Sequence, residues 1–316
     1  MKNFNSYINK SIQRIKLAQN RGLTNFGLRL FTHNRFEKNI KVKKNIAYGK
    51  NKLQKFDIVT QKKSDAIHPV IFYIHGGAWC GGDKYGYTMY CKKFANLGYT
   101  VVNINYRLMP KVDVKVCVLD CIKAINYFTK NYKSILQNAK ISYDIDFSHC
   151  FMIGDSAGAH LCSLIAGMQT AQKIKLDINI VALGLYYGVY DFNDIQHDPS
   201  PVMTDLDGYW RSIYKSTKAL YKRISPTTYI TPNFPATFMT SGEIDKLHFQ
   251  SEIFANALKQ NGTKLDYLSF DKSRQDGRHA FLNAGFLPSA KEAFARVSEF
   301  FEEQLNNNNL IFNQNN

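Results

Sequence analysis

The stretch "HCFMIGDSAGAHL", residues 149–161, joins an apolar run to a helix-like run through a glycine-rich turn. Ser156 stands between Gly154 and Gly158 in the pattern Gly-x-Ser-x-Gly. A serine on a sharp strand-to-helix turn has a strained backbone, so its neighbours at −2 and +2 must be small. The following helix directs its first N–H groups toward the same point, where they stabilise negative charge. The stretch predicts a nucleophilic serine, with an ordinary helix-capping serine as the alternative.

Strand-like and helix-like segments alternate on both sides of this turn. Continuous apolar runs such as "VIFYI" (70–74) are typical of strands buried on both faces. This alternation predicts an α/β fold with a mostly parallel central sheet and helices on both faces. The expected strands are 53–61, 68–75, 99–108, 149–154, part of 178–191, 236–242 and 264–270, and the expected helices are 84–97, 113–133, 157–169, 247–260 and 288–305.

The 316 residues divide unevenly along the chain. Residues 1–44 are expected to form a basic N-terminal helical extension, with helical apolar spacing over 5–18. Residues 45–305 form the predicted α/β domain. Within it, the proline-punctuated segment 192–234 is expected to be a small cap-like insertion with a helical middle. The Asn-rich tail 306–316 is predicted to be disordered.

Charge and cysteine content limit the classes of partner. The net charge is +16, but residues 1–63 hold 16 of the 41 Lys and Arg and only two acids. The basic character therefore belongs to the N-terminal part, and no nucleic-acid-binding motif accompanies it. Membrane-surface contact through residues 1–44 is left open. Six cysteines without a paired CxxC array, no signal-peptide core and no membrane-spanning stretch predict a cytoplasmic protein without a metal site.

A serine hydroxyl needs a base and an orienting acid to act as a nucleophile. His279 follows the last expected strand, and Asp245 follows the strand before it. Both therefore fall where an open α/β sheet places its site, at the carboxyl ends of strands. Asp191 also ends a strand and competes with Asp245 for the acid role, and Glu243 is a third candidate.

Three motifs together resemble the esterase/lipase families of the α/β-hydrolase superfamily. They are His75-Gly76-Gly77-Ala78-Trp79, Tyr106-Arg107-Leu108-x-Pro110 and Gly154-Asp155-Ser156-Ala157-Gly158-Ala159-His160. The most similar branches are the hormone-sensitive-lipase-like carboxylesterases and the arylformamidase-like enzymes with an HGGxW motif. The resemblance covers about residues 45–305 and implies the order Ser156, Asp245, His279 for the catalytic triad.

The resemblance also assigns the oxyanion hole. It implies that Gly76, Gly77 and Ala157 donate N–H groups to the developing oxyanion, with Ala78 as a further candidate because it replaces the third glycine of the HGGG form. Because Gly76 and Gly77 lack β-carbons, their N–H groups can approach a substrate oxygen closely. His75 is interpreted as a residue that shapes the loop and not as the catalytic base. The candidate pocket residues are Trp79, Asp155 and Tyr106, and Asp155 is also interpreted as a carboxylate that holds the elbow or the loop.

The expected activity is hydrolysis of carboxylic esters with short acyl groups, through an acyl-enzyme and without a cofactor. The first alternative is an arylformamidase that acts on N-formyl aryl amines. The second is a ligand-binding protein on the same fold that has no catalytic activity. The sequence leaves the oligomeric state, the alcohol and the acyl chain length open.

Overall fold

The computed structural model describes residues 39–193, 195, 197–213 and 218–314. Within them, eight strands form one sheet in the order β1-β2-β4-β3-β5-β6-β7-β8. β1 and β2 pair antiparallel, as do β2 and β4, and every other neighbouring pair is parallel. The strands are β1 (Ile40–Ala47), β2 (Lys55–Gln61), β3 (His68–Ile74), β4 (Thr100–Ile104), β5 (Ile145–Asp155), β6 (Ile180–Tyr186), β7 (Ala236–Gly242) and β8 (Leu265–Phe270).

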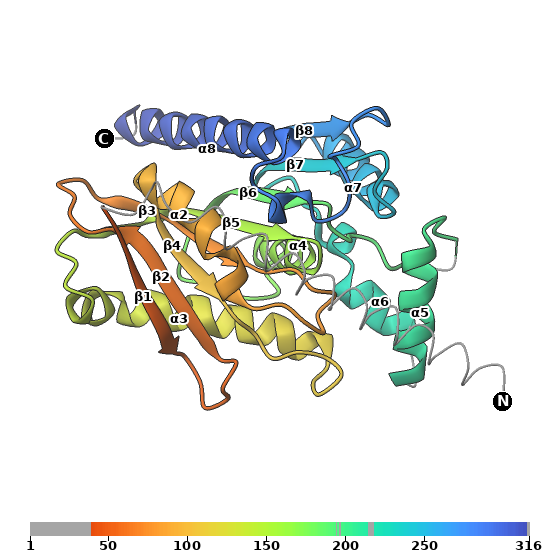
Figure 1. Cartoon of the computed structure of the whole chain (residues 1–316), viewed down its shortest axis with the longest axis horizontal. Helices are drawn as coiled ribbons and strands as arrows, with labels where there is room; N and C mark the ends of the chain where they lie inside the picture. The colour runs from red at the N-terminus through yellow and green to blue at the C-terminus, as the bar shows by residue number, and fades with distance from the viewer. Residues whose placement is uncertain (1–38, 194, 196, 214–217, 315–316) are drawn as a thin grey trace.

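Helices cover both faces of this sheet, as predicted, and Figure 1 shows α8 and α3 on opposite sides of it. Along β3, Phe72 belongs to one hydrophobic core and Ile71 to the other, because successive side chains of a strand point to opposite faces. The first core includes residues of α3 (Val114–Asn138), α4 (Ala157–Thr170) and α7 (His248–Gln260). The second includes residues of α2 (Thr88–Asn96) and α8 (Pro288–Gln314).

The connection between β6 and β7 carries the segment that the sequence singles out as an insertion. It contains α5 (Pro201–Ile213), α6 (Lys218–Ile224) and the 3-10 turn η2 (Pro226–Tyr229). In Figure 1, α5 and α6 lie beside the sheet, beyond the end of α4. We call residues 192–234 the cap segment.

Two boundaries differ from the prediction. The sheet begins at Ile40, inside the segment expected to be an N-terminal extension, because β1 pairs with β2. β1 lacks a strong apolar pattern because it is an edge strand, and its Lys41, Lys43 and Lys44 are the kind of residues that protect an exposed edge from further pairing. At the other end, α8 continues to Gln314, where the Asn-rich composition predicted disorder. The helix expected over residues 5–18 lies outside the described residues.

Candidate active site

Ser156 lies at the sharp turn between β5 and α4. Its backbone angles are φ 52° and ψ −119°, a conformation that L-residues rarely adopt. The flanking glycines are required by space: a β-carbon on Gly158 would lie 2.0 Å from the carbonyl oxygen of Ile74, and one on Gly154 would lie 2.3 Å from the carbonyl carbon of Gly158. Gly158 is therefore required by the close approach of β3, and Gly154 by the close approach of the first turn of α4.

The structure brings Ser156, His279 and Asp245 into one hydrogen-bonded chain. Nε2 of His279 lies 3.2 Å from Oγ of Ser156, and Nδ1 of His279 lies 2.8 Å from Oδ2 of Asp245. The Asp245 side chain is 1% exposed, whereas the His279 side chain is 39% exposed. With the proton on Nδ1, His279 donates to Asp245 and accepts from the Ser156 hydroxyl. This is the arrangement that nucleophilic catalysis by serine requires.

The charge balance at His279 favours a base. Desolvation lowers the pKa of His279, but the negative charge of Asp245 and its hydrogen bond outweigh this effect and raise the pKa above the ordinary value. A raised pKa makes the ring a stronger proton acceptor while it is neutral. Tyr187, the residue directly after β6, packs against the same ring, with the two ring centroids 5.0 Å apart. The sequence analysis did not identify Tyr187, because an aromatic residue after an apolar strand carries no functional signal.

The alternative acids lie in other environments. Oδ1 of Asp191 accepts hydrogen bonds from the backbone N–H and the side-chain amide of Asn193, each at 2.8 Å. The backbone N–H of Glu243 donates to the carbonyl of Phe270. Asp245 alone of these three acids has a hydrogen bond to His279 among the described contacts.

Gly76 does not fit its expected role as an oxyanion donor. The N–H of Gly76 donates to Oδ1 of Asp155 at 2.9 Å, so it is occupied within the protein. By contrast, no hydrogen bond of the Gly77, Ala78 or Ala157 N–H is found in the described part of the chain. Gly77 and Ala78 have φ values of 121° and 52°, and Ala157 is the first residue of α4. Gly77, Ala78 and Ala157 are therefore the candidates for an oxyanion hole.

The three predicted pocket residues are buried, and each makes a hydrogen bond in or beside the loop after β3. Trp79 is 2% exposed and donates through Nε1 to Nδ1 of His160. Tyr106 donates through its hydroxyl to the carbonyl of His75 at 2.9 Å. Asp155 accepts from Gly76 and from the hydroxyls of two tyrosines, Tyr73 and Tyr87.

His75 has the loop-shaping position expected for it. Its Nδ1 lies 2.8 Å from the carbonyl oxygen of Gly76, and its ring stacks on Tyr106 with centroids 4.5 Å apart. Burial lowers the pKa of His75, so the ring is held in its neutral form. Its imidazole is enclosed and has no hydrogen bond to Ser156 among the described contacts.

The six cysteines are free thiols, five of them buried and Cys80 partly exposed. Among the described residues, no cluster of three or more His, Cys, Asp or Glu side chains has the arrangement of a metal site. None of the described helices is both long enough and apolar enough to cross a membrane.

Comparison with known proteins places the site in context. A family model described as BD-FAE matches residues 56–258. Esterase LipQ of Mycobacterium tuberculosis is 30% identical over 243 residues, which cover 73% of this chain and 54% of LipQ. The probable carboxylic ester hydrolase LipM of the same organism is 30% identical over 189 residues, which cover 57% of this chain and 42% of LipM. The chain thus spans about half the length of these relatives.

Among solved structures, esterase B of Lactobacillus rhamnosis superimposes with a TM-score of 0.83 at 18% identity, covering 99% of each chain. At this level of identity the likeness concerns the fold. The predicted α/β-hydrolase fold is confirmed.

Proposed function

The chain belongs to the BD-FAE family, and from this membership and the geometry around Ser156 we propose that it is a serine hydrolase of carboxylic esters. The single observation that carries the proposal is the continuous hydrogen-bonded chain from Ser156 through His279 to the buried Asp245. Three N–H groups without protein acceptors among the described residues, those of Gly77, Ala78 and Ala157, support it. The names of the relatives LipQ and LipM, both described as ester hydrolases, agree with this activity.

In the proposed reaction, Oγ of Ser156 attacks the ester carbonyl while Nε2 of His279 takes the hydroxyl proton. Asp245 holds the proton of His279 on Nδ1 and stabilises the imidazolium that forms. The negative charge that develops on the carbonyl oxygen is accommodated by N–H groups of the loop and by Ala157 at the start of α4. His279 then protonates the leaving alcohol. Water repeats the sequence on the acyl-enzyme and releases the acid.

We propose short acyl groups as the preferred substrates. The space between the loop after β3 and the cap segment is filled by buried aromatic rings. Trp210 stacks on Phe192 with centroids 4.9 Å apart and lies 5.3 Å from Trp79. This packed contact between the loop and the cap segment supports the proposal of short acyl groups.

We place the protein in the cytoplasm as part of the same proposal. Free thiols, five of them buried, are typical of a reducing compartment. The role of residues 1–38 lies outside the described residues. Separating the cell into soluble and membrane fractions and probing each for the chain tests the location.

The test uses Ser156→Ala and a series of p-nitrophenyl esters of increasing acyl length. We expect the variant to lose several orders of magnitude in kcat, because the triad acts as a unit. Wild type should react with a fluorophosphonate probe, and the variant should not. A variant as active as wild type would show that Ser156 is not the nucleophile. An N-formyl aniline assayed in parallel distinguishes the arylformamidase activity, and no turnover of either substrate class with no labelling would favour a non-catalytic protein.

A further inference from the structure

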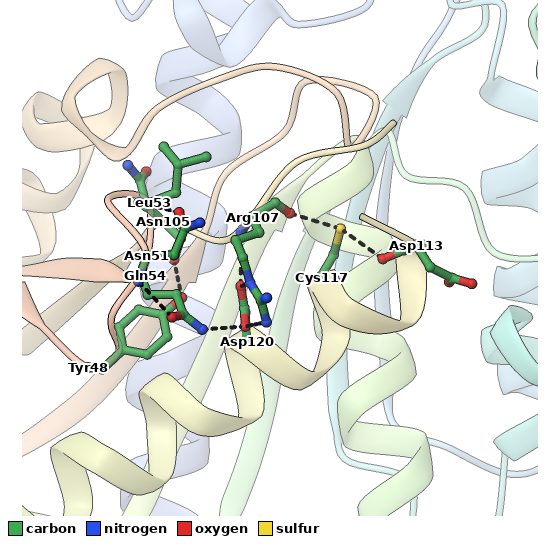
Figure 2. Close-up of polar contacts among 9 residues, drawn as sticks. All are labelled: Tyr48, Asn51, Leu53, Gln54, Asn105, Arg107, Asp113, Cys117 and Asp120. Atoms are coloured by element: carbon green, nitrogen blue, oxygen red, sulfur yellow. Dashed lines mark hydrogen bonds and ion pairs between the residues drawn. The ribbon is translucent and has the colours of Figure 1, made fainter. Parts of the chain in front are cut away.

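Another buried carboxylate outside the triad, that of Asp120, lies against the segment after β4. Figure 2 shows Asp120 of α3 between the side chains of Arg107 and Gln54. Its Oδ1 accepts from Arg107 Nη2 and from Gln54 Nε2, both at 2.8 Å, and its Oδ2 accepts from Arg107 Nε at 2.8 Å. Asp120 is 1% exposed, so this bidentate ion pair is shielded from water on the carboxylate side.

The same carboxylate also holds the backbone of Arg107. Oδ2 of Asp120 accepts from the Arg107 backbone N–H at 3.0 Å, and Sγ of Cys117 donates to the Arg107 carbonyl at 3.1 Å. Cys117 and Asp120 are three residues apart and therefore lie on one face of α3. The backbone N–H and C=O of Arg107 are therefore both held by side chains of one turn of α3, as Figure 2 shows.

Tyr106 and Met109, on either side of Arg107, hold the two ends of residues 75–79, which we call the oxyanion loop. Tyr106 donates through its hydroxyl to the carbonyl of His75 at 2.9 Å. The backbone N–H of Met109 donates to the carbonyl of Trp79, also at 2.9 Å. Between His75 and Trp79 lie Gly76, Gly77 and Ala78, the last two with N–H groups that have no acceptor among the described residues.

We infer that Asp120 is a positioning residue that sets the place of the Gly77 and Ala78 N–H groups, acting through Arg107 and the segment 106–109. The inference rests on the proposed ester hydrolysis, because it concerns the oxyanion hole of that reaction. Oxyanion donors stabilise the transition state more than the ground state, and the effect depends on their exact distance from the charged oxygen. Loss of Asp120 should therefore reduce kcat much more than it changes KM.

The experiment compares Asp120→Ala, Asp120→Asn and the control Asp266→Ala. Asp266 makes a similar bidentate pair with Arg296 at 2.7 and 2.9 Å, but it joins β8 to α8 and has no contact with the loop among the described contacts. All variants are assayed with a short p-nitrophenyl ester at a temperature where unfolding curves show them folded. We expect Asp120→Ala to lower kcat about 10- to 100-fold with KM within about threefold, since losing one donor outright costs about 10²–10³ in kcat.

The conservative variant and the control make the interpretation specific. Asp120→Asn keeps one acceptor oxygen and should recover part of the lost kcat, whereas Asp266→Ala should keep kcat within about twofold of wild type. If folded Asp120→Ala has the kcat of wild type, the inference is wrong. If Asp120→Ala does not fold, Arg107→Lys takes its place, because it keeps the backbone bond to Asp120 and loses only the bidentate pair. We expect a kcat about 3- to 10-fold lower, and an unchanged kcat overturns the inference.

Hydrogen exchange separates this inference from the proposed function. In Asp120→Ala, the backbone amides of residues 75–82 should exchange faster than in wild type, while those of β8 should not change. If wild type hydrolyses no ester but the exchange changes as expected, the proposed function fails and the positioning of the loop stands. If wild type is active and neither kcat nor exchange changes in the variant, the inference about Asp120 fails alone.

Discussion

Replacing Asp245 by asparagine should remove most of the activity through the protonation state of His279. Each oxygen of Asp245 is in use: Oδ1 accepts from the backbone N–H of Leu247 at 2.9 Å, and Oδ2 accepts from Nδ1 of His279 at 2.8 Å. An asparagine has a single acceptor oxygen. If this oxygen serves Leu247, the amide NH₂ faces His279, and Nδ1 must then accept. The proton moves to Nε2, so the ring can no longer accept the proton of Ser156.

The hydrogen bonds of Asp245 give the direction of the change in kcat, and the behaviour of triad aspartates in general gives its size. An asparagine in place of a triad aspartate costs about 10⁴ in kcat when it imposes the wrong tautomer. The pH dependence should change as well. Ester hydrolysis needs neutral His279, and Asp245 raises the pKa of His279, so the acid limb of wild type lies above the ordinary value. Asp245 is the largest influence that raises this pKa, so without its negative charge the acid limb should move to lower pH.

The assay is kcat/KM for a short p-nitrophenyl ester between pH 5 and about 9, for wild type, Asp245→Asn and the control Asp191→Asn. Asp191 lies five residues after the end of β6, and its carboxylate accepts hydrogen bonds from Asn193, so Asp191→Asn should keep kcat within about threefold of wild type. A larger loss in Asp191→Asn than in Asp245→Asn would refute the assignment of the acid. An acid limb that stays in place in Asp245→Asn would refute the electrostatic reasoning.

Two further predictions concern stability. Gly158→Ala should lower the free energy of unfolding by about 1–3 kcal/mol or more, because its β-carbon would lie 2.0 Å from the Ile74 carbonyl oxygen. The control is Gly285→Ala, whose β-carbon would meet only the tip of a lysine side chain. Equal urea midpoints for the two variants would contradict the explanation. His160 is fully buried, and burial lowers its pKa to about 4. Between pH 6.5 and about 4 the unfolded chain therefore binds a proton at His160 that the folded chain does not. The free energy of unfolding should fall by about 3 kcal/mol as the pH falls through this window. Urea unfolding at pH 7 and at about pH 4.5 should show a smaller loss in His160→Gln than in wild type, and an equal loss would count against this origin.

Local patterns account for the parts of the fold that were predicted well. Gly154 is needed because the turn itself leaves no space for a β-carbon, whereas Gly158 is needed because β3 lies against it; both glycines nevertheless appear in one five-residue motif. The apolar runs of β3 and β5 are continuous because both faces of these strands are covered, so the pattern does not depend on a particular partner. β1 was missed for the opposite reason: an edge strand is half exposed, and its lysines hide the apolar period.

The alternating α/β order and the turn at Ser156 could be predicted from the sequence, because both follow from short-range geometry. The order of Asp245 and His279 after Ser156 could be predicted as well, because each residue follows the end of an expected strand. Only the tertiary structure decided which N–H groups remain available and which side chains are enclosed. Gly76 is occupied because Asp155, 79 residues later, reaches its N–H, and the loop is held through Tyr106 and Asp120. Such contacts join residues that are distant in the chain, and hydrogen bonds and burial of this kind arise only when the strands and helices pack together.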